Sequence, residues 1–302
     1  MQLSAVLSKG SASSSRWLAR QSRDPYVRQR NKDTSNASRL SYRSRSSFKL
    51  ISLAKSHPIL TKNTRAVVDL GAAPGGWSQV AAHLLGLDRL KNQEEKPPKC
   101  QIWAIDLLPM EPTPNVQILQ GDFLSSSVQE TLRSMVGSPE SGDGVDTVLS
   151  DMMAPMTGNR TRDVNLNLEL CAAATVFARG VLKKTEEGKE MKLVKGKKEY
   201  PGGSLVIKFF AHPDLDDFKK KELDPWFSKV VVEKPKESRS ESSEAYWSHL
   251  VILPSDFATK HLFLQATSNR SYSDNLERLR LVGQIRWSGA KAGYLSISGG
   301  FV

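Results

Sequence analysis

The chain has 302 residues, of which 39% are hydrophobic, and this proportion excludes a wholly disordered protein. No run approaches the roughly 20 apolar residues of a membrane-spanning helix, which argues against an integral membrane protein. The net charge of +11 is unevenly placed, because residues 1–65 carry +12 and residues 66–302 carry −1. A basic end on a neutral body suggests nucleic acid, an anionic membrane surface or a targeting segment.

The two cysteines, Cys100 and Cys171, are too few for a disulfide framework, and no CxxC or HExxH pattern offers a metal site. We therefore expect a reducing compartment and chemistry that uses no metal ion.

The first predicted segment is a leader of residues 1–23. It has several Lys and Arg residues within a Ser-containing stretch, and no acidic residue precedes Asp24. This composition is typical of a mitochondrial transit peptide, whereas the apolar run Leu3–Leu7 is too short for a secretory signal. The alternative is a disordered basic tail that touches RNA, and both interpretations can hold.

Residues 24–65 are predicted to form a basic, RNA-contacting arm that includes the first helix. Apolar residues recur at near-helical spacing within Tyr42–His57, and Pro58 ends the run. Basic side chains in the arm, together with those of Lys234–Arg239, can pair with phosphates without reading sequence. Trp17, Tyr26 and Tyr42 are candidates for stacking on bases.

Residues 66–254 are predicted to form one α/β domain with a Rossmann-like, mostly parallel, doubly wound sheet of about seven strands, because short apolar runs alternate with helix-length segments. The predicted strands are Ala66–Leu70, Gln101–Ile105, Val116–Leu119, Val145–Leu149, Ser204–Phe210, Lys229–Val232 and Ala245–Leu253. The predicted helices between them are Ser78–Gly86, Ser126–Val136, Asn165–Leu182 and Leu215–Phe227. Polar insertions are expected at about 91–99, 137–144 and 183–203, and residues 255–302 form an extension of unknown role.

The most distinctive motif is Val67–Trp77 (VVDLGAAPGGW), in which a strand runs through a turn rich in Gly, Ala and Pro into a helix that begins near Trp77. Such a turn lets the backbone approach a ligand closely. The motif is neither the three-glycine dinucleotide fingerprint nor a Walker loop. A plain strand-to-helix turn is the alternative, but the length of the motif favours a binding turn.

Four acidic residues follow or end predicted strands: Asp69, Asp106, Asp122 and Asp151. In an open parallel sheet those strand ends face one rim, and ligands bind there. A carboxylate after the second strand can accept both hydroxyls of a ribose, and Asp122 could accept from an adenine amine. Any one of these residues alone could instead form a turn or cap a helix. Together they predict a nucleoside cofactor at the rim.

Lys208 lies in the middle of an apolar strand, where a lysine is costly unless it is paired or neutral. If it faces the rim near Asp151, burial and a neighbouring cation would favour the neutral amine, which can act as a general base for a hydroxyl. The alternative is an edge strand from which Lys208 faces water.

These motifs, in this order, resemble the FtsJ-type RNA 2′-O-methyltransferases. The matching segments are Tyr42–Leu50, Val68–Gln79, Asp106–Pro109, Gly121–Phe123, Leu149–Met152, Lys208 and Lys234–Tyr246. The resemblance implies an S-adenosylmethionine-dependent methyltransferase fold and a metal-free methyl transfer to RNA. It also implies cofactor contacts at Gly75, Trp77, Asp106, Asp122 and Asp151.

By the same resemblance, the catalytic tetrad would be Lys49, Asp151, Lys208 and Glu244. Lys208 would take the proton of a 2′-hydroxyl that attacks the sulfonium methyl in line, and Lys49 would disfavour its charged form by repulsion. Asp151 and Glu244 would orient the lysines and the ribose.

The family's relatives imply a uridine in large-subunit ribosomal RNA as the target, and the leader places the expected enzyme in the mitochondrial matrix. We expect a monomer without stable membrane insertion. The alternatives are a cytosolic tRNA 2′-O-methyltransferase of the same fold and a non-catalytic ribosome-assembly factor that only binds RNA. The basic arm and the missing third glycine disfavour a small-molecule methyltransferase or an NAD enzyme.

Overall fold

The computed structural model describes residues 19, 22–32, 41–87, 100–137, 144–184, 192–194, 197–199 and 202–252. The predicted extension at 255–302, the insertion at 91–99 and most of the leader lie outside these residues. The chain divides into two compact units, Met1–Pro254 and Ser255–Val302, and everything described belongs to the first. Within the described residues no helix is both long and apolar enough to cross a membrane.

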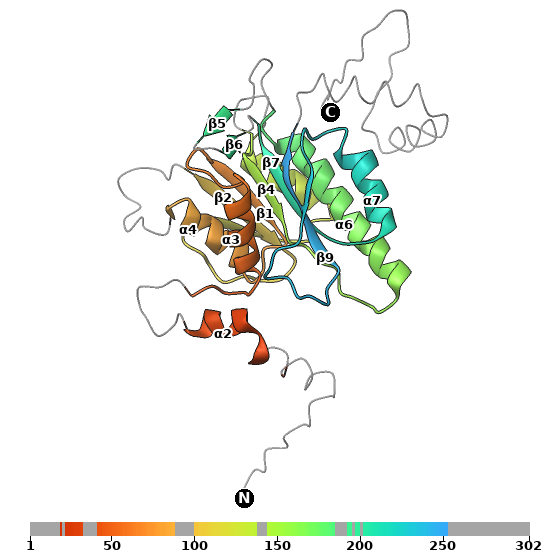
Figure 1. Ribbon diagram of the computed structural model, residues 1–302. Coiled ribbons are helices and arrows are strands. Elements are labelled where there is room, and N and C mark those ends of the chain that lie inside the picture. Colours follow the sequence, from red (N-terminus) through yellow and green to blue (C-terminus); the bar gives the residue numbers. More distant parts are fainter. Residues whose placement is uncertain are drawn as a thin grey trace, which may run out of the picture. The chain divides into compact units, whose positions relative to one another are not determined.

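The first unit is built on a seven-stranded sheet with the strand order β3-β2-β1-β4-β7-β9-β8 (Figure 1). The strands are β1 (Ala66–Leu70), β2 (Gln101–Asp106), β3 (Val116–Gln120), β4 (Thr147–Ser150), β7 (Ser204–Phe210), β8 (Val231–Glu233) and β9 (Glu244–Val251). Strands β1 to β4 and β7 are mutually parallel, and β9 runs antiparallel to both β7 and β8. The predicted sheet is thereby confirmed.

Helices cover both faces of this sheet. Helices α3 (Ser47–Ser56) and α4 (Gly76–Leu84) pack on one face, and α5 (Ser126–Val136), α6 (Arg160–Val181) and α7 (Pro213–Phe218) pack on the other, with a π-helix at Lys219–Leu223 after α7. A further helix, α2 (Pro25–Lys32), precedes them in the chain. In β1, Val67 packs with residues of α3 and α4, whereas Val68 packs with residues of α5 and α6. This alternation is the period of two expected of a strand buried on both faces.

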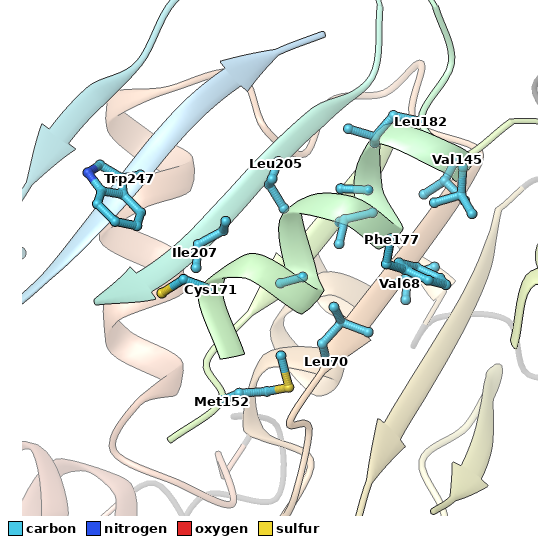
Figure 2. Packing of buried hydrophobic residues seen from close by; sticks show 14 of the residues in the cluster. Val68, Leu70, Val145, Met152, Cys171, Phe177, Leu182, Leu205, Ile207 and Trp247 are labelled. Atoms are coloured by element: carbon cyan, nitrogen blue, oxygen red, sulfur yellow. The ribbon is translucent and has the colours of Figure 1, made fainter. Parts of the chain in front are cut away.

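The larger of the two apolar layers is formed by strands β1, β2, β4, β7 and β9 with α5, α6 and α7. Figure 2 shows Val68 and Phe177 beside one another, with Leu205 and Ile207 of β7 along the same helix. Each large aliphatic side chain buried here contributes about 1.5–3 kcal/mol to folding relative to an exposed one.

The observed helices start earlier than predicted where polar residues cap them. Helix α6 begins at Arg160 rather than at Asn165, because the side chain of Asn159 accepts a hydrogen bond from the Arg162 amide. The predicted helix Leu215–Phe227 divides into α7 and the π-helix. The insertion predicted at 183–203 contains a hairpin of β5 (Lys192–Val194) and β6 (Lys197–Glu199), which the Lys- and Glu-rich sequence did not indicate.

Ligands of such sheets bind where neighbouring strands are connected in opposite directions, and here that point lies between β1 and β4. The chain steps outward from β1 to β2 and β3, then crosses back to β4 on the other side of β1. The carboxyl ends of β1, β2 and β4 therefore open the rim at which the sequence predicts a site.

Candidate active site

The turn after β1 requires glycine at two positions. Gly71 has a φ of +75° and Gly75 has a φ of +104°, both in the left-handed region. A Cβ on Gly71 would lie 2.8 Å from the Cα of Met152, so the backbone after β4 passes directly against the turn. The amides of Gly71 and Ala72 donate to the Ile105 carbonyl at 2.9 and 3.0 Å, which ties the turn to the end of β2.

Asp106 and Asp122 lie at the rim as predicted. The Asp106 carboxylate, at the end of β2, accepts the amide of Ala73 at 2.9 Å and the amide of Leu108 at 2.8 Å. Each carboxylate oxygen still has a lone pair for another donor. Asp122 is exposed after β3, and its Oδ1 accepts only the Leu124 amide, at 2.9 Å, among the described residues.

Asp69 is not part of this open rim, so the prediction of four acidic residues there was wrong for one of them. It lies inside β1 with no exposed surface, and its Oδ2 accepts the Ser78 hydroxyl at 2.6 Å. Within the described residues its Oδ1 has no hydrogen-bond partner. Burial raises the pKa of Asp69 to about 7, and repulsion from Asp151 and Asp106 adds to the increase. The hydrogen bond from Ser78 lowers the pKa but only partly offsets the effect of burial.

This buried carboxyl predicts a pH-dependent stability. The pKa is 3.8 in the unfolded chain and about 7 in the folded one, so ionisation weakens the fold as the pH rises from about 4 to about 7. We expect Asp69→Asn, which keeps an acceptor for Ser78, to gain stability over the wild type across that range, by on the order of 4 kcal/mol at most. Urea unfolding of both proteins at pH 5 and pH 8 measures it. A stability difference that is the same at both pH values would contradict the assigned pKa.

The rim residues suit a nucleoside cofactor. Asp106 offers acceptors for ribose hydroxyls, and the glycine turn allows the backbone a close approach. Three apolar side chains that could cover a flat base follow the two carboxylates: Leu107, Leu108 and Leu124, which are 65%, 63% and 39% exposed. The residues present therefore fit S-adenosylmethionine, the cofactor that the resemblance implies.

Trp77 and Gly75 contribute to this region through the backbone. The Trp77 indole is buried and donates through Nε1 to the Ser46 carbonyl at 2.9 Å, so any contact of Trp77 with a cofactor comes from its main chain. Gly75 caps α4 in a conformation that a side chain would strain, and a Cβ there would lie 2.9 Å from the Arg43 guanidinium.

The four residues of the predicted tetrad lie together as two ion pairs. Lys208 is on β7, an interior strand between β4 and β9, so the alternative of an edge lysine was wrong. Its Nζ is 3.1 Å from Asp151 Oδ1 and also donates to the Asp151 carbonyl. Lys49 on α3 places its Nζ 2.5 Å from Glu244 Oε1 at the start of β9. The four side chains are between 7% and 15% exposed.

Tyr246, which the sequence analysis did not place in the site, joins the two pairs. Its hydroxyl lies 3.0 Å from Asp151 Oδ1 and 3.1 Å from Glu244 Oε1, so its one proton can be donated to either carboxylate. Tyr246 pairs with Lys208 in the β7–β9 register, and its position two residues after Glu244 puts both on one face of β9. This two-residue spacing from Glu244 was the signal in the sequence that could have placed Tyr246 in the site.

The charges of the site are set by burial and by these contacts. Burial would raise the pKa of Glu244, but Lys49, Lys208 and the Ser238 hydroxyl together hold it below its ordinary value. Burial and the carboxylates of Asp151 and Glu244 raise the pKa of Tyr246 well above its ordinary value. At neutral pH, Glu244 is therefore an anion and Tyr246 a neutral donor.

We expect Tyr246→Phe to slow turnover about tenfold and to lower the free energy of unfolding by about 1.5–3 kcal/mol, because a buried carboxylate loses a donor. Single-turnover kinetics and urea unfolding measure the two effects. Cofactor binding is measured as well, because the Tyr246 hydroxyl lies 3.0 Å from Asp151, one of the expected cofactor contacts. Unchanged turnover in the variant would remove Tyr246 from the site.

The segment that leads into α3 is fixed to the cofactor rim. Gln79 accepts the Arg43 amide at 3.1 Å, and the Arg43 guanidinium donates to the carbonyls of Glu111 and Pro112 at 2.6 Å each. These contacts reach both α4 and the chain that follows Asp106. The position of Lys49 on α3 is consequently coupled to the residues that would hold a cofactor.

Residues 42–251 match the model of the FtsJ-like methyltransferase family. The chain is 37% identical over 234 residues to the ribosomal RNA large subunit methyltransferase E of Alkalilimnicola ehrlichii, a match that covers 77% of this chain and 92% of that protein. It is 40% identical over 238 residues to the protein of that name from Bartonella bacilliformis, with 78% and 82% covered.

Among solved structures, the fold is similar to a crystal structure described as a ribosomal RNA methyltransferase from Plasmodium falciparum. The TM-score is 0.52 at 26% sequence identity, and the match covers 70% of this chain and all of the other. In the described residues, no group of three or more His, Cys, Asp or Glu side chains is placed to hold a metal ion.

Proposed function

The chain belongs to the FtsJ-like methyltransferase family, and from this premise we propose that it methylates the 2′-hydroxyl of a uridine in mitochondrial large-subunit ribosomal RNA, with S-adenosylmethionine as the methyl donor. The observation that carries the proposal is the pair of lysine–carboxylate contacts that Tyr246 joins at the carboxyl ends of the strands. A protein that only bound RNA would have no use for two enclosed lysines in such an arrangement.

In the proposed reaction, S-adenosylmethionine supplies a methyl group on a positively charged sulfur, already activated for transfer. Asp106 would hold the cofactor ribose, and the turn at Gly71 and Gly75 would let the backbone approach the rest of the cofactor. The Nζ of Lys208, as the neutral amine, takes the proton of the RNA 2′-hydroxyl while the hydroxyl oxygen takes the methyl group, and the resulting ammonium group pairs with Asp151. Asp151 fixes that amine through its side chain and its carbonyl.

On the other side of the site, Glu244 binds Lys49. The Tyr246 hydroxyl lies between Glu244 and Asp151 and links this pair to the Lys208–Asp151 pair. We propose that Lys49 positions the ribose and adds positive charge near Lys208. Because these side chains are at most 15% exposed, the RNA hydroxyl enters a site from which most water is already excluded.

Ribosomal RNA as substrate is supported by the names of the two bacterial relatives, and the basic arm of residues 24–65 would bring RNA to the domain by its charge. The mitochondrial location rests on the composition of residues 1–23. The cytosolic tRNA methyltransferase remains the second candidate, because the tetrad does not distinguish the two RNAs.

A map of 2′-O-methylation in cells that lack the protein tests the proposal. We expect one uridine of the mitochondrial large-subunit RNA to lose its methyl group and cytosolic RNAs to keep theirs. Loss at a cytosolic tRNA would favour the second candidate. A complete methylation map would contradict both.

A further inference from the structure

A cavity of about 370 Å³ lies between the N-terminal arm and the connection of β8 to β9, residues 234–243. Arg23, Asp24 and Tyr26 line it from the arm, and Glu237 and Arg239 line it from the connection. Neither the tetrad nor the cofactor residues use these side chains. The cavity is therefore a separate feature of the same end of the molecule.

The cavity adjoins the tetrad through one residue. Ser238 lines the cavity, and its hydroxyl donates to Glu244 Oε1 at 3.0 Å. The same Glu244 oxygen binds Lys49. An RNA strand with one ribose at Lys208 must continue across the neighbouring surface. The cavity is part of that surface, because the hydrogen bond from Ser238 joins its lining to Glu244 of the tetrad.

The walls of the cavity are held together by a buried carboxylate. The Asp24 side chain is 6% exposed and lies 2.8 Å from the Arg45 guanidinium and 3.7 Å from that of Arg239. Arg45 also donates to the Glu237 carbonyl at 2.6 Å. The arm, the start of α3 and the β8–β9 connection thus form the cavity without a ligand.

Two buried polar atoms in this region lack a hydrogen-bond partner among the described residues. They are the donor Nε of Arg45 and the acceptor Oε2 of Glu237, and both residues line the cavity. Buried polar groups in proteins are nearly always hydrogen-bonded, so each of these two atoms indicates a partner that the described residues do not supply. The Watson–Crick edge of an unpaired nucleobase presents N–H donors and ring acceptors side by side and could supply both.

The charge of the cavity favours a base over a phosphate. Its lining contains Arg23, Arg45 and Arg239 against Asp24, Glu237 and Glu241, so it offers no net positive charge to an anion. The Arg45 guanidinium lies over the Tyr26 ring, 5.8 Å from its centroid. Aromatic rings and arginine planes are the surfaces on which unpaired RNA bases stack.

We propose that this cavity binds the base of an unpaired RNA nucleotide next to the one that is methylated. The inference rests on the proposed function, because it assumes an RNA strand at the tetrad. Glu237 accepts from an N–H of the base, and Arg45 donates to a ring acceptor. The edge concerned is the Watson–Crick edge, which a base paired in a helix cannot offer, so the enzyme requires a single-stranded neighbour at its target.

Fluorescence anisotropy with the full-length protein tests the assignment. The probes are a short single-stranded RNA of random sequence and a ribose-phosphate backbone of the same length without bases. The variant is Glu237→Met, which keeps the length of the side chain and removes the acceptor. The bond from Arg45 to the Glu237 main chain remains. We expect the wild type to prefer the base-bearing RNA, and the variant to lose about tenfold of that preference.

Glu130→Met, the same substitution at an exposed position of α5, is the matched control and should keep the wild-type preference. Equal affinity of the wild type for both probes, or an undiminished preference in Glu237→Met, would overturn the assignment. The measurement involves no methyl transfer. A protein that shows the expected preference yet methylates no ribosomal RNA would therefore contradict the proposed function and not the cavity's role.

Discussion

Lys208→Arg is expected to lower methyl transfer by about a thousandfold while the protein stays folded and still binds S-adenosylmethionine. An arginine keeps a cation beside Asp151, but its guanidinium remains protonated and cannot take a proton. General-base catalysis typically contributes 10² to 10⁴ in rate, which sets the size of the loss. Single-turnover methylation of unmodified ribosomal RNA and a separate binding measurement for the cofactor give the two readouts.

Lys208→Ala is the companion variant. It removes the base and also leaves the Asp151 carboxylate without its cation in a site where the two side chains are 7% and 15% exposed. Breaking a buried pair in this way costs about 3–5 kcal/mol, so this variant should be both inactive and less stable. More than a tenth of the wild-type rate in Lys208→Arg would show that a positive charge suffices and that Lys208 is not the base.

Gly71→Ala is expected to destabilise the fold strongly. The φ of +75° alone costs a residue with a side chain about 1–2 kcal/mol, and the new Cβ would lie 2.8 Å from the Cα of Met152. Overpacking against backbone adds about 1–3 kcal/mol, for a total of roughly 2–5 kcal/mol. Since Met152 follows Asp151, the displaced chain should also reduce turnover. Urea unfolding and single-turnover rates measure both.

Gly86→Ala separates the cost of the positive φ from the cost of overpacking. Gly86 has a φ of +74°, but nothing lies within 4 Å of the Cβ that a substitution would add. This variant should therefore lose only the roughly 1–2 kcal/mol that the positive φ costs, and it should keep full activity. Equal losses in the two variants would mean that the close approach of the turn to Met152 has no energetic consequence.

The sequence was sufficient to predict the sheet because its strands are short apolar runs separated by Gly, Pro and Asp. The strand pattern alone left Lys208 either at an edge or at the rim, and the family resemblance predicted it as a neighbour of Asp151. Helix starts were less predictable. Asn159 extends α6 by a turn through a side-chain cap, a local bond that the apolar periodicity does not reflect.

The features that the sequence did not reveal depend on contacts between distant segments. Asp69 follows apolar residues as Asp151 does, yet it is completely buried and accepts a hydrogen bond from Ser78 of α4. In the sequence, Tyr246 is one of several aromatic residues in predicted strands. Only the register of β9 shows that its hydroxyl lies between the carboxylates of Asp151 and Glu244. The cavity at Asp24 requires the arm to fold against residues some two hundred positions later in the chain.

The position of the transferred methyl group tests the account most directly. Purified protein is incubated with unmodified large-subunit ribosomal RNA and labelled S-adenosylmethionine, and the RNA is digested to nucleosides and analysed by mass spectrometry. We expect label on the ribose 2′-oxygen of a uridine, and none with Lys208→Arg. Label on a base, or on a ribose with Lys208→Arg as abundantly as with the wild type, would contradict it.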